Sequence, residues 1–340
     1  MNLSPDSPLR IGVLGAAKIA RLFVDGVRPS RKVVVAAVAS RDVDRATAFA
    51  QDAGVAMVHP TYEALLHDPE IDAIYVPLPN NLHAAWSIRA ADAGKHVLCE
   101  KPLAATAAEA RAVFEAARAN GVYVVEAYPY RAQPQTLKMR ELLTADAIGK
   151  LQLIQASFGF PLTDVANIRM NPTLAGGALM DAGSYPVSLV RTIAGTKPTR
   201  VFAISRWAES GVDMTTMATL EFASGLLAQI SCSFATARHR HAFIAGDAGS
   251  INTTYLNDTS AAFPPVLEVK RGTGWDAQRE IIETASGNGF LAEAESFHDL
   301  VRHGFGQWVG ATPDESIDIA LTLDALAVSA RTGAWADVGS

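Results

Sequence analysis

The first third of the chain alternates short apolar segments with longer segments of helical character. The apolar segments are 11–14, 33–39, 73–76, 96–99 and 122–126, and the helical segments between them are 17–27, 45–53, 82–93 and 107–120. Gly94 and Gly121 stand where two of the helices should end, a common position for glycine. Continuous apolar strands separated by helices are typical of a parallel sheet that is covered on both faces. The segment therefore predicts a doubly wound α/β domain.

Beyond about residue 127 the pattern changes to strands joined by turns. Six segments have strand character: 151–160, 199–207, 215–222, 226–234, 241–245 and 266–271. Two helices, 289–303 and 313–332, then close the chain. A run of strands with few helices between them predicts a mostly antiparallel sheet in a second domain of the α+β class. We expect the first domain to span 1–126 and the second to span 127–340, with a cleft shared between them.

Composition excludes several classes of protein. The 340 residues, of which 49% are hydrophobic, suffice for roughly two domains with ordinary cores. The net charge of -6, with no run of five like charges, gives no electrostatic reason to expect nucleic acid or an anionic membrane as a partner. Cys99 and Cys232 lie in apolar contexts without CxxC spacing, which predicts buried free thiols. No apolar stretch has the length of a spanning helix, so we expect a soluble, cytoplasmic protein.

The turn after the first apolar segment has the composition of a dinucleotide-binding turn. It reads Gly15-x-Ala17-x-x-Ala20, a variant of Gly-x-Gly-x-x-Gly. Glycine allows the tight turn, and small residues at the other two positions allow close approach of the pyrophosphate and packing of helix on strand. The amides of Ala17, Lys18 and Ile19 would then open a helix whose positive end faces phosphate. Because the pattern follows a strand and begins a helix, we favour this reading over a simple helix start.

The end of the second apolar segment indicates which cofactor is bound. An enzyme that uses NAD usually presents an acidic residue here to the ribose 2'-hydroxyl. This chain has Ser40 and Arg41, with Arg45 one helical turn later. A hydroxyl and guanidinium groups suit a 2'-phosphate, so NADP is favoured over NAD. Alternatively, Arg41 stacks on the adenine or lies in solvent.

Three polar residues further along the chain could carry acid and base chemistry. Lys101 follows the apolar run 95–99, where it could face a nicotinamide ring. Oxidation of an alcohol by hydride transfer needs a base for the hydroxyl proton and a positive neighbour for the developing alkoxide. Tyr185 could serve as that base, because an adjacent ammonium lowers the pKa of a phenol. Asp181 lies on the same face as Tyr185 if 181–190 is helical, and could orient the lysine or bind a substrate hydroxyl.

Five stretches of the sequence carry a resemblance that spans essentially the whole chain. They read Gly-Ala-Ala-Lys-Ile-Ala at 15–20, Pro-Leu-Pro-Asn-Asn-Leu-His at 77–83, Ala-Gly-Lys-His-Val-Leu-Cys-Glu-Lys-Pro-Leu at 93–103, Glu-Ala-Tyr at 126–128, and Gly-Gly-Ala-Leu-Met-Asp-Ala-Gly-Ser-Tyr-Pro at 176–186. The Glu-Lys-Pro and Asp-x-Gly-x-Tyr motifs are the most specific. In this order the stretches resemble the glucose-fructose oxidoreductase and inositol dehydrogenase (Gfo/Idh/MocA) family, especially its sugar dehydrogenase and dimeric dihydrodiol dehydrogenase branch.

The resemblance implies an N-terminal Rossmann domain, a C-terminal open-faced sheet for substrate binding and oligomerisation, and NAD(P) between the two. In the family, the lysine of Glu-Lys-Pro contacts the nicotinamide ribose and the substrate oxygen. This role maps to Lys101, with Glu100 beside it as a further cofactor contact. The proline of the motif is often preceded by a cis bond, so the resemblance implies a cis bond between Lys101 and Pro102.

The resemblance also implies roles for a loop and for the aromatic residue at 185. The loop 77–83 would pass over the cofactor, with Pro77, Asn80 and His83 near the ribose or the nicotinamide. Many family members have histidine where this chain has Tyr185. The tyrosine therefore favours the sugar and dihydrodiol branch over the inositol branch.

One departure from the family concerns the segment after the first domain. Many relatives read Glu-Ala-Phe-Met-Trp-Arg, whereas residues 126–131 read Glu-Ala-Tyr-Pro-Tyr-Arg. Pro129 would redirect the local backbone, which puts the expected substrate contacts of Tyr128 and Tyr130 in doubt. Arg169 would reach the cofactor or an acidic part of the substrate, or lie exposed in a loop.

The second domain offers two further expectations. His239 and His241 share one face of an expected strand, but no carboxylate or cysteine accompanies them at ligand spacing, so we expect a surface or interface pair and no metal site. An open sheet face commonly buries against another subunit. We therefore expect a homo-oligomer, most simply a homodimer formed through the C-terminal sheets.

The leading functional hypothesis is an NADP-dependent dehydrogenase or reductase that acts on an aldose, a keto-sugar or a related cyclic polyol or diol. The second hypothesis is a non-catalytic regulatory protein that senses NAD(P) on the same fold. Lys101, Asp181 and Tyr185 favour the enzyme, because a sensor would not need a proton relay.

Overall fold

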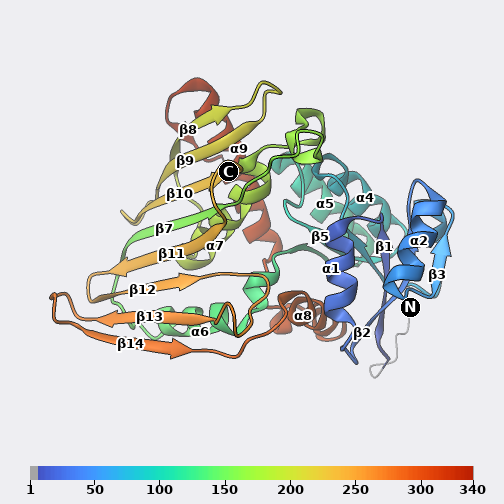
Figure 1. The fold of residues 1–340 in the computed structure, drawn as a ribbon, viewed down its shortest axis with the longest axis horizontal. Coiled ribbons are helices and arrows are strands. Elements are labelled where there is room, and N and C mark those ends of the chain that lie inside the picture. Colours follow the sequence, from blue (N-terminus) through green and yellow to red (C-terminus); the bar gives the residue numbers. More distant parts are fainter. Residues whose placement is uncertain (1–6, 340) are drawn as a thin grey trace. The chain divides into compact units, whose positions relative to one another are not determined.

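The computed structural model describes residues 7–339, which fall into two units (Figure 1). The first unit comprises the chain up to Ala104, Ala108–Ala132 and Asn288–Pro313, and the second comprises Ala105–Ala107, Gln133–Gly287 and the chain from Asp314 onward. A single boundary after residue 126 would assign 288–313 to the second domain. Contacts instead place this late segment in the first unit, so the chain leaves that unit and returns to it.

The first unit contains a parallel sheet whose strands, within residues 7–339, have the order β3-β2-β1-β4-β5-β6. The strands are β1 (Leu9–Leu14), β2 (Val33–Ala39), β3 (Met57–His59), β4 (Ala73–Val76), β5 (His96–Glu100) and β6 (Val124–Ala127). Helices α1 (Lys18–Val27), α2 (Val43–Ala53), α3 (Tyr62–Leu66), α4 (Asn80–Asp92) and α5 (Ala107–Asn120) alternate with them. The strand order reverses between β1 and β4, so the predicted doubly wound fold is confirmed. The sequence pattern missed β3 and α3, because three and five residues are too few for a periodicity.

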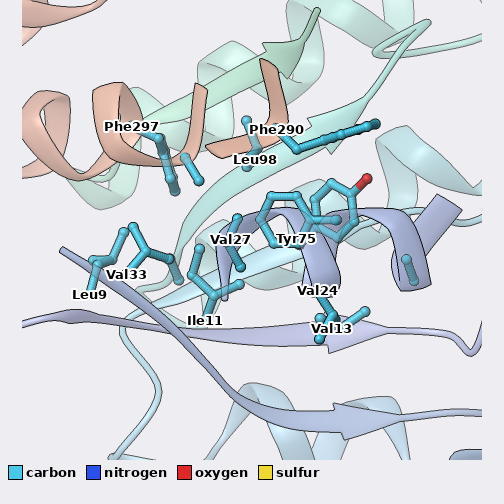
Figure 2. Close-up of a cluster of buried hydrophobic side chains, with 14 of the residues drawn as sticks. Leu9, Ile11, Val13, Val24, Val27, Val33, Tyr75, Leu98, Phe290 and Phe297 are labelled. Atoms are coloured by element: carbon cyan, nitrogen blue, oxygen red, sulfur yellow. The ribbon is translucent and has the colours of Figure 1, made fainter. Parts of the chain in front are cut away.

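Helix α8 (Gly289–His303) completes the core of this unit (Figure 2). Phe290 and Phe297 are buried with Leu9, Ile11 and Val27 in one hydrophobic cluster. The phenyl rings belong to the end of the chain, and the aliphatic side chains belong to its beginning. Each fully buried phenylalanine contributes about 2 kcal/mol by removing apolar surface from water, so α8 is part of the core and not a peripheral helix.

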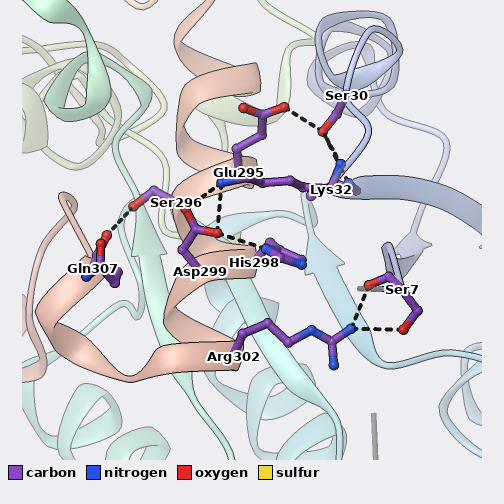
Figure 3. Close-up of polar contacts among 10 residues, drawn as sticks. Ser7, Ser30, Lys32, Glu295, Ser296, His298, Asp299, Arg302 and Gln307 are labelled. Atoms are coloured by element: carbon purple, nitrogen blue, oxygen red, sulfur yellow. Dashed lines mark hydrogen bonds and ion pairs between the residues drawn. The ribbon is translucent and has the colours of Figure 1, made fainter. Parts of the chain in front are cut away.

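Polar contacts fix the outer side of α8 to the same unit (Figure 3). The ammonium of Lys32 lies 2.8 Å from a carboxylate oxygen of Asp299, and the hydroxyl of Ser30 donates to Glu295 at 2.7 Å. These contacts join the start of β2 to a helix more than 250 residues later. They are partly exposed, so each adds little to stability, but together they specify how α8 lies on the unit.

The second unit contains a larger sheet whose strands, among the described residues, have the order β14-β13-β12-β11-β7-β10-β9-β8-β15. They are β7 (Leu151–Gly159), β8 (Arg200–Trp207), β9 (Asp213–Glu221), β10 (Leu227–Ser233), β11 (His239–Gly246), β12 (Gly249–Thr254), β13 (Val266–Arg271), β14 (Gln278–Glu283) and β15 (Ala336–Asp337). Strands β7 and β10 are parallel, and the other neighbours are antiparallel. The predicted mostly antiparallel sheet is confirmed.

Helices α6 (Pro134–Thr144), α7 (Ser184–Ala194) and α9 (Pro313–Thr332) accompany this sheet, and a π-helical turn, η4 (Leu179–Gly183), leads into α7. The sequence pattern missed β12, β14 and α6. Strand β14 is largely exposed, so its sequence lacks an apolar face that would have revealed it. Helix α7 packs against β7 and β10 near the middle of the sheet, which fixes the position of Tyr185.

Candidate active site

The predicted cofactor residues of the first unit gather at one edge of its sheet. Gly15 follows β1, Pro77 follows β4, and Lys101 follows β5, and these three strands are adjacent and parallel. Asn80, half-buried, begins α4 at the same edge. In open α/β sheets, ligands bind outside the carboxyl ends of the strands at the point where the strand order reverses. The reversal here lies between β1 and β4, so these residues occupy the position of a nucleotide site.

The turn between β1 and α1 has the backbone of a phosphate-binding turn. Gly15 has a φ of 101°, a value that side chains rarely allow. A Cβ at Gly15 would also lie 3.1 Å from Cδ2 of Leu78, closer than ordinary van der Waals contact. Ala17 is extended at the start of α1, and no described side chain caps the helix. The first amides of α1, including those of Lys18 and Ile19, therefore have the geometry that receives an anion.

The end of β2 carries donors for a phosphate group. Ser40 is buried, whereas Arg41 and Arg45 are exposed. The acidic residue of this segment, Asp42, uses Oδ1 to accept hydrogen bonds from the amides of Asp44 and Arg45 at 3.0 and 3.1 Å. It thereby caps α2. A hydroxyl and two guanidinium groups fit a 2'-phosphate, and the nearby carboxylate is engaged by the helix.

Tyr62, the first residue of α3, lies over this turn and was not among the predicted residues. Its ring packs edge-on against Trp86 with centroids 4.7 Å apart, and its hydroxyl lies 3.6 Å from the position of a Cβ on Gly15. Burial raises the pKa of Tyr62, and the neighbouring Arg41 opposes that rise through its charge and its backbone. The hydroxyl is therefore a candidate contact for a bound phosphate. In the sequence, the motif Gly15-x-Ala17 indicated this turn. The five-residue helix α3 is too short to show a periodicity, so the position of Tyr62 could not be predicted.

His83 lies between two loops at the carboxyl edge of the sheet. Its ring is 1% exposed, with Nδ1 2.7 Å from the carbonyl oxygen of Pro102 and Nε2 2.7 Å from that of Leu78. Burial and, to a smaller extent, the charge of Lys101 lower the pKa of His83 to about 4, although the two carbonyl groups act in the opposite direction. The neutral ring donates one N–H to these carbonyls. We predicted that His83 contacts the cofactor, and this geometry favours a positioning role for it.

Glu100 and Lys101 end β5 and begin the loop that contains a cis peptide bond. The bond between Lys101 and Pro102 is cis, as the resemblance implied. Glu100 accepts a hydrogen bond from the hydroxyl of Tyr75 at 2.6 Å, and the ring of Tyr75 stacks on Phe23 at 4.0 Å. Lys101 itself is 9% exposed. Lys101 thus directly follows a strand end that the hydrogen bond between Tyr75 and Glu100 holds in place.

Two other carboxyl groups of the first unit are fully buried. Glu126, 1% exposed, accepts the N–H of Leu103 at 3.0 Å, directly after the cis proline. Glu293 on α8 is buried to the same degree, and burial followed by the charge of Glu100 raises its pKa well above the usual value. Burial thus favours the protonated form of Glu293. The sequence could not reveal this, because Glu293 and Glu100 are 193 positions apart.

In the second unit, the structure joins Asp181 to Arg169. Asp181 lies on the π-helical turn η4 and accepts a hydrogen bond from Nε of Arg169 at 2.7 Å. The start of η4 is held by Asp213, whose Oδ2 accepts the N–H of Leu179 at 2.7 Å. Gly177 has a φ of 112°, and a Cβ there would clash with Oδ1 of Asp213. Arg169, half-buried in the short 3-10 helix Ile168–Met170, thus forms an ion pair with a buried aspartate of the chain itself, and its contact with the cofactor or the substrate stays a prediction.

Tyr185, the second residue of α7, is 5% exposed and lies in an aromatic setting. Its hydroxyl accepts a hydrogen bond from Nδ2 of Asn257 at 3.0 Å, and its ring meets that of Phe158 edge-on at 5.4 Å. The guanidinium of Arg240 lies over the same ring, 3.9 Å from its centroid. Asn257 and Arg240 were not among the predicted residues. Arg240 stands between two histidines that drew attention to the other face of the strand.

Tyr128 and Tyr130 lie in the segment where the chain departs from its relatives. Pro129 begins a short 3-10 helix, Pro129–Ala132, so it does redirect the backbone. Both tyrosine side chains are fully buried, and their rings meet edge-on at 6.0 Å. The substrate contact expected of Tyr128 stays a prediction, made for a side chain that is 0% exposed in this structure.

The remaining candidates of the sequence are the pair His239 and His241 and the two cysteines. Within residues 7–339 no group of three or more histidine, cysteine, aspartate or glutamate side chains could hold a metal ion. His239 and His241 lie with ring centroids 6.4 Å apart, and Nδ1 of His241 is 2.9 Å from the hydroxyl of Ser157. Cys99 and Cys232 are buried free thiols, as predicted, and burial raises the pKa of both.

A doubly wound unit with a glycine turn at its switch point, accompanied by a second unit built on a large sheet, is the architecture expected of a nicotinamide-linked oxidoreductase. Residues 9–128 match the family described as an oxidoreductase family with an NAD-binding Rossmann fold, and residues 136–252 match the GFO/IDH/MocA C-terminal domain. The chain therefore belongs to the Gfo/Idh/MocA family of oxidoreductases, as its motifs suggested.

The relatives cover nearly the whole chain. D-xylose 1-dehydrogenase (NADP(+)) 2 of Haloferax volcanii is 37% identical over 334 residues, which are 96% of this chain and 98% of that protein. Trans-1,2-dihydrobenzene-1,2-diol dehydrogenase of Mus musculus is 35% identical over 76% of this chain and 80% of that protein. A solved structure of a 3-ketoreductase from Actinomadura kijaniata, in complex with NADP and TDP-benzene, superposes with a TM-score of 0.85 at 30% identity and covers 95% of this chain and 98% of that one.

Among residues 7–339, no helix is both long and apolar enough to cross a membrane.

Proposed function

We propose that the protein is an NADP-dependent oxidoreductase that transfers a hydride between the nicotinamide ring and a CH-OH or C=O carbon of a sugar, a keto-sugar or a cyclic diol. The observation that carries this proposal is similarity over both units to enzymes named for these substrates. Similarity over the second unit matters, because a nucleotide-binding unit alone serves many different reactions.

The residues at the end of β2 support NADP as the cofactor. Ser40, Arg41 and Arg45 supply a hydroxyl and two positive charges, and Asp42 is engaged as the cap of α2. Charged donors of this kind bind phosphate strongly. When bound, the cofactor supplies the hydride carrier. In this proposal the residues of the chain bind and orient it through the turn at Gly15 and the strand ends.

The choice of cofactor can be tested at one residue. Arg41→Ala is expected to raise the KM for NADP roughly ten- to a hundredfold, because a charged hydrogen bond contributes about 1.5 to 3 kcal/mol. The KM for NAD should stay close to that of the wild type. Arg31→Ala, which removes an exposed arginine at the other end of β2, is the matched control. Equal losses for both cofactors would contradict the assignment of Arg41 to the 2'-phosphate.

We assign Lys101 and Tyr185 to the proton and Asp181 to the substrate. In the oxidation direction the substrate hydroxyl gives its proton to the Tyr185 oxygen, and the ammonium of Lys101 stabilises the alkoxide as it forms. Asp181, oriented by Arg169, accepts a hydrogen bond from a second hydroxyl group of the substrate. The burial of Lys101 and Tyr185 supports this assignment, because electrostatic interactions are stronger away from water.

The deciding experiment is a panel of aldoses, keto-sugars and cyclic diols assayed with NADP(H) and NAD(H). Lys101→Met and Tyr185→Phe are each expected to lower turnover about 10² to 10⁴-fold. Both variants should still change the fluorescence of NADPH on mixing. Retained turnover in both variants would remove the proposed proton pathway. Tight NADPH binding without turnover of any panel member would favour the non-catalytic sensor.

We further propose that the sheet of the second unit forms a homodimer. Ile204 and Met217 are cross-strand neighbours, 65% and 64% exposed, and the register continues this row through Ser157 to His241. Exposed apolar side chains on an open sheet are typical of subunit contacts. Met217→Glu is expected to convert a dimer to a monomer in light scattering, and a wild-type monomer would contradict the proposal. The cytoplasmic location stays a prediction.

A further inference from the structure

Arg240 occupies an unusual position on β11. It is 8% exposed and points to the buried side of the strand, whereas its neighbours His239 and His241 point to the other side. Its guanidinium carbon lies 3.9 Å from the ring centroid of Tyr185, 4.6 Å from that of Tyr255 and 4.9 Å from that of Phe158. Ring faces carry partial negative charge and attract cations. Three aromatic rings thus surround this buried positive charge.

Asn257 links the guanidinium to the hydroxyl of Tyr185. Nη1 of Arg240 donates to Oδ1 of Asn257 at 3.2 Å, and Nδ2 of Asn257 donates to the Tyr185 oxygen at 3.0 Å. Arginine has donors and no acceptor, so the amide of Asn257 must turn its oxygen toward Arg240. Its NH2 group must then face Tyr185. The tyrosine oxygen is therefore an acceptor in this bond, and its own hydrogen is directed elsewhere.

We propose that Arg240 and Asn257 are positioning residues that hold Tyr185 and stabilise its phenolate form, so that Tyr185 can exchange a proton with a substrate oxygen near neutral pH. The inference rests on the proposed function for its catalytic consequence. A positive charge over the ring and a donor to the oxygen both favour the charged form of a phenol. In the oxidation direction the phenolate takes the hydroxyl proton while the C–H electron pair leaves as hydride to the nicotinamide. In reduction both transfers reverse.

Other ionisable groups lie on α7 and on the elements that pack against it. Asp181 on η4 is paired with Arg169. Burial raises the pKa of the Cys232 thiol on β10, so this group is neutral. Arg191, toward the other end of α7, is paired with Asp318. Strand β7 brings no ionisable side chain.

The test follows the titration of Tyr185 directly in the full-length protein. Tyrosine labelled with ¹³C at Cζ gives one signal per residue, and the signal that is missing in Tyr185→Phe belongs to Tyr185. Arg240→Met is expected to raise the Tyr185 pKa by about one unit. Arg240→Lys keeps the positive charge, so the pKa of Tyr185 in this variant should stay close to that of the wild type. Asn257→Ala should raise the pKa as well, by removing the donor to the oxygen.

Arg238→Met is the matched control, because Arg238 also lies over an aromatic ring, that of Phe160 at 5.7 Å, but not over Tyr185. It should leave the titration of Tyr185 unchanged. An unchanged Tyr185 pKa in folded Arg240→Met and Asn257→Ala would overturn the proposal. If Arg240→Met does not fold, Asn257→Ala and Arg240→Lys decide the question, since they alter the donor and the ring contact separately.

The catalytic consequence is measured with a substrate from the panel. The pH profile of kcat/KM is expected to move in Arg240→Met in the same direction and by about the same amount as the NMR titration. NADPH binding should not change. If the Tyr185 titration shifts in Arg240→Met but the wild type turns over no substrate, the effect of Arg240 on Tyr185 is supported and the proposed function is rejected. Turnover with an unmoved pH profile in Arg240→Met would reject the role of Arg240 alone.

Discussion

The surroundings of Lys101 and those of Tyr185 are held in different ways. Around Lys101, buried side chains bind the main chain: His83 binds the carbonyl of Pro102, and Glu126 binds the amide of Leu103. Around Tyr185, side chains bind one another, through an amide, a guanidinium and aromatic rings. The first arrangement fixes the path of a loop. The second holds one aromatic side chain and its hydroxyl group, so the two sites should respond differently to mutation.

The largest expected effect is a loss of stability at low pH, caused by two histidines of the first unit, one of which lies beside Lys101. The pKa of His83 and that of His96 are lowered to about 4, mainly by burial, and His96 accepts the N–H of Tyr123 at 3.0 Å through Nδ1. Below pH 6.5 the unfolded chain binds protons that the folded rings do not yet take up. Stability therefore falls between pH 6.5 and about 4. We expect a loss of ~2 kcal/mol for each ring, or ~4 kcal/mol together, from pH 7 to pH 5.

Urea unfolding of the wild type and of His83→Gln at the two pH values checks this. The variant should lose about half of the pH dependence, whatever its stability at pH 7. An equal slope in both proteins would show that the loop around Pro102 does not depend on a neutral ring at His83.

A glycine of the second unit should show the next largest effect. Gly177→Ala places a Cβ against Asp213 at a φ of 112°, so we expect a loss of ~3 kcal/mol or more in unfolding free energy. Gly211→Ala is the control, since its φ is 87° but no described atom lies within 4 Å of the added Cβ. It should cost ~1 kcal/mol. Similar losses in both variants would show that Asp213 does not hold η4 tightly.

The next prediction tests the hydrogen bond between Glu126 and the main chain of the loop that follows Lys101. Glu126→Ala leaves the amide of Leu103 without its acceptor, which should cost ~2 kcal/mol. Glu126→Gln keeps an acceptor oxygen and should cost less than half as much. Thermal unfolding of the two variants measures the difference. Equal losses would mean that the charge of Glu126, and not its bond to the loop, stabilises this region.

The smallest effect is expected at the cap of α2. Asp42→Ala removes the acceptor for the amides of Asp44 and Arg45 and should lower stability by ~1 kcal/mol. Asp44→Ala removes an exposed charge in the same turn and should cost only a few tenths of that. If Asp44→Ala proves the more harmful, Asp42 is not the cap, and its carboxylate would be available to a ribose hydroxyl.

The sequence predicted the nucleotide-binding unit well, because its signals are local. A strand, a glycine at a left-handed φ and the following helix occupy consecutive positions, so Gly15 and the end of β2 could be placed by pattern alone. The cis bond before Pro102 came from a motif of three residues. The full-length comparisons confirm the family that these motifs suggested.

The supports of Tyr185 could not be predicted in the same way. Arg240 and Asn257 come from a strand and a loop that follow Tyr185 by 55 and 72 positions, and no spacing rule connects them. The pair His239 and His241 was the visible pattern on that strand, and it faces the opposite side. Burial could not be predicted either: the resemblance pointed to a substrate contact at Tyr128, and its side chain is 0% exposed.

The return of the chain at 288–313 has a consequence for biosynthesis. When the ribosome has released the first 132 residues, Phe290 and Phe297 have not yet been made, so the core around Leu9 and Ile11 must wait while strands β7 to β14 of the second sheet emerge. A protein cut at residue 126 would present an open apolar face instead of a free-standing nucleotide-binding domain. The first unit thus depends on sequence that is made after most of the second unit.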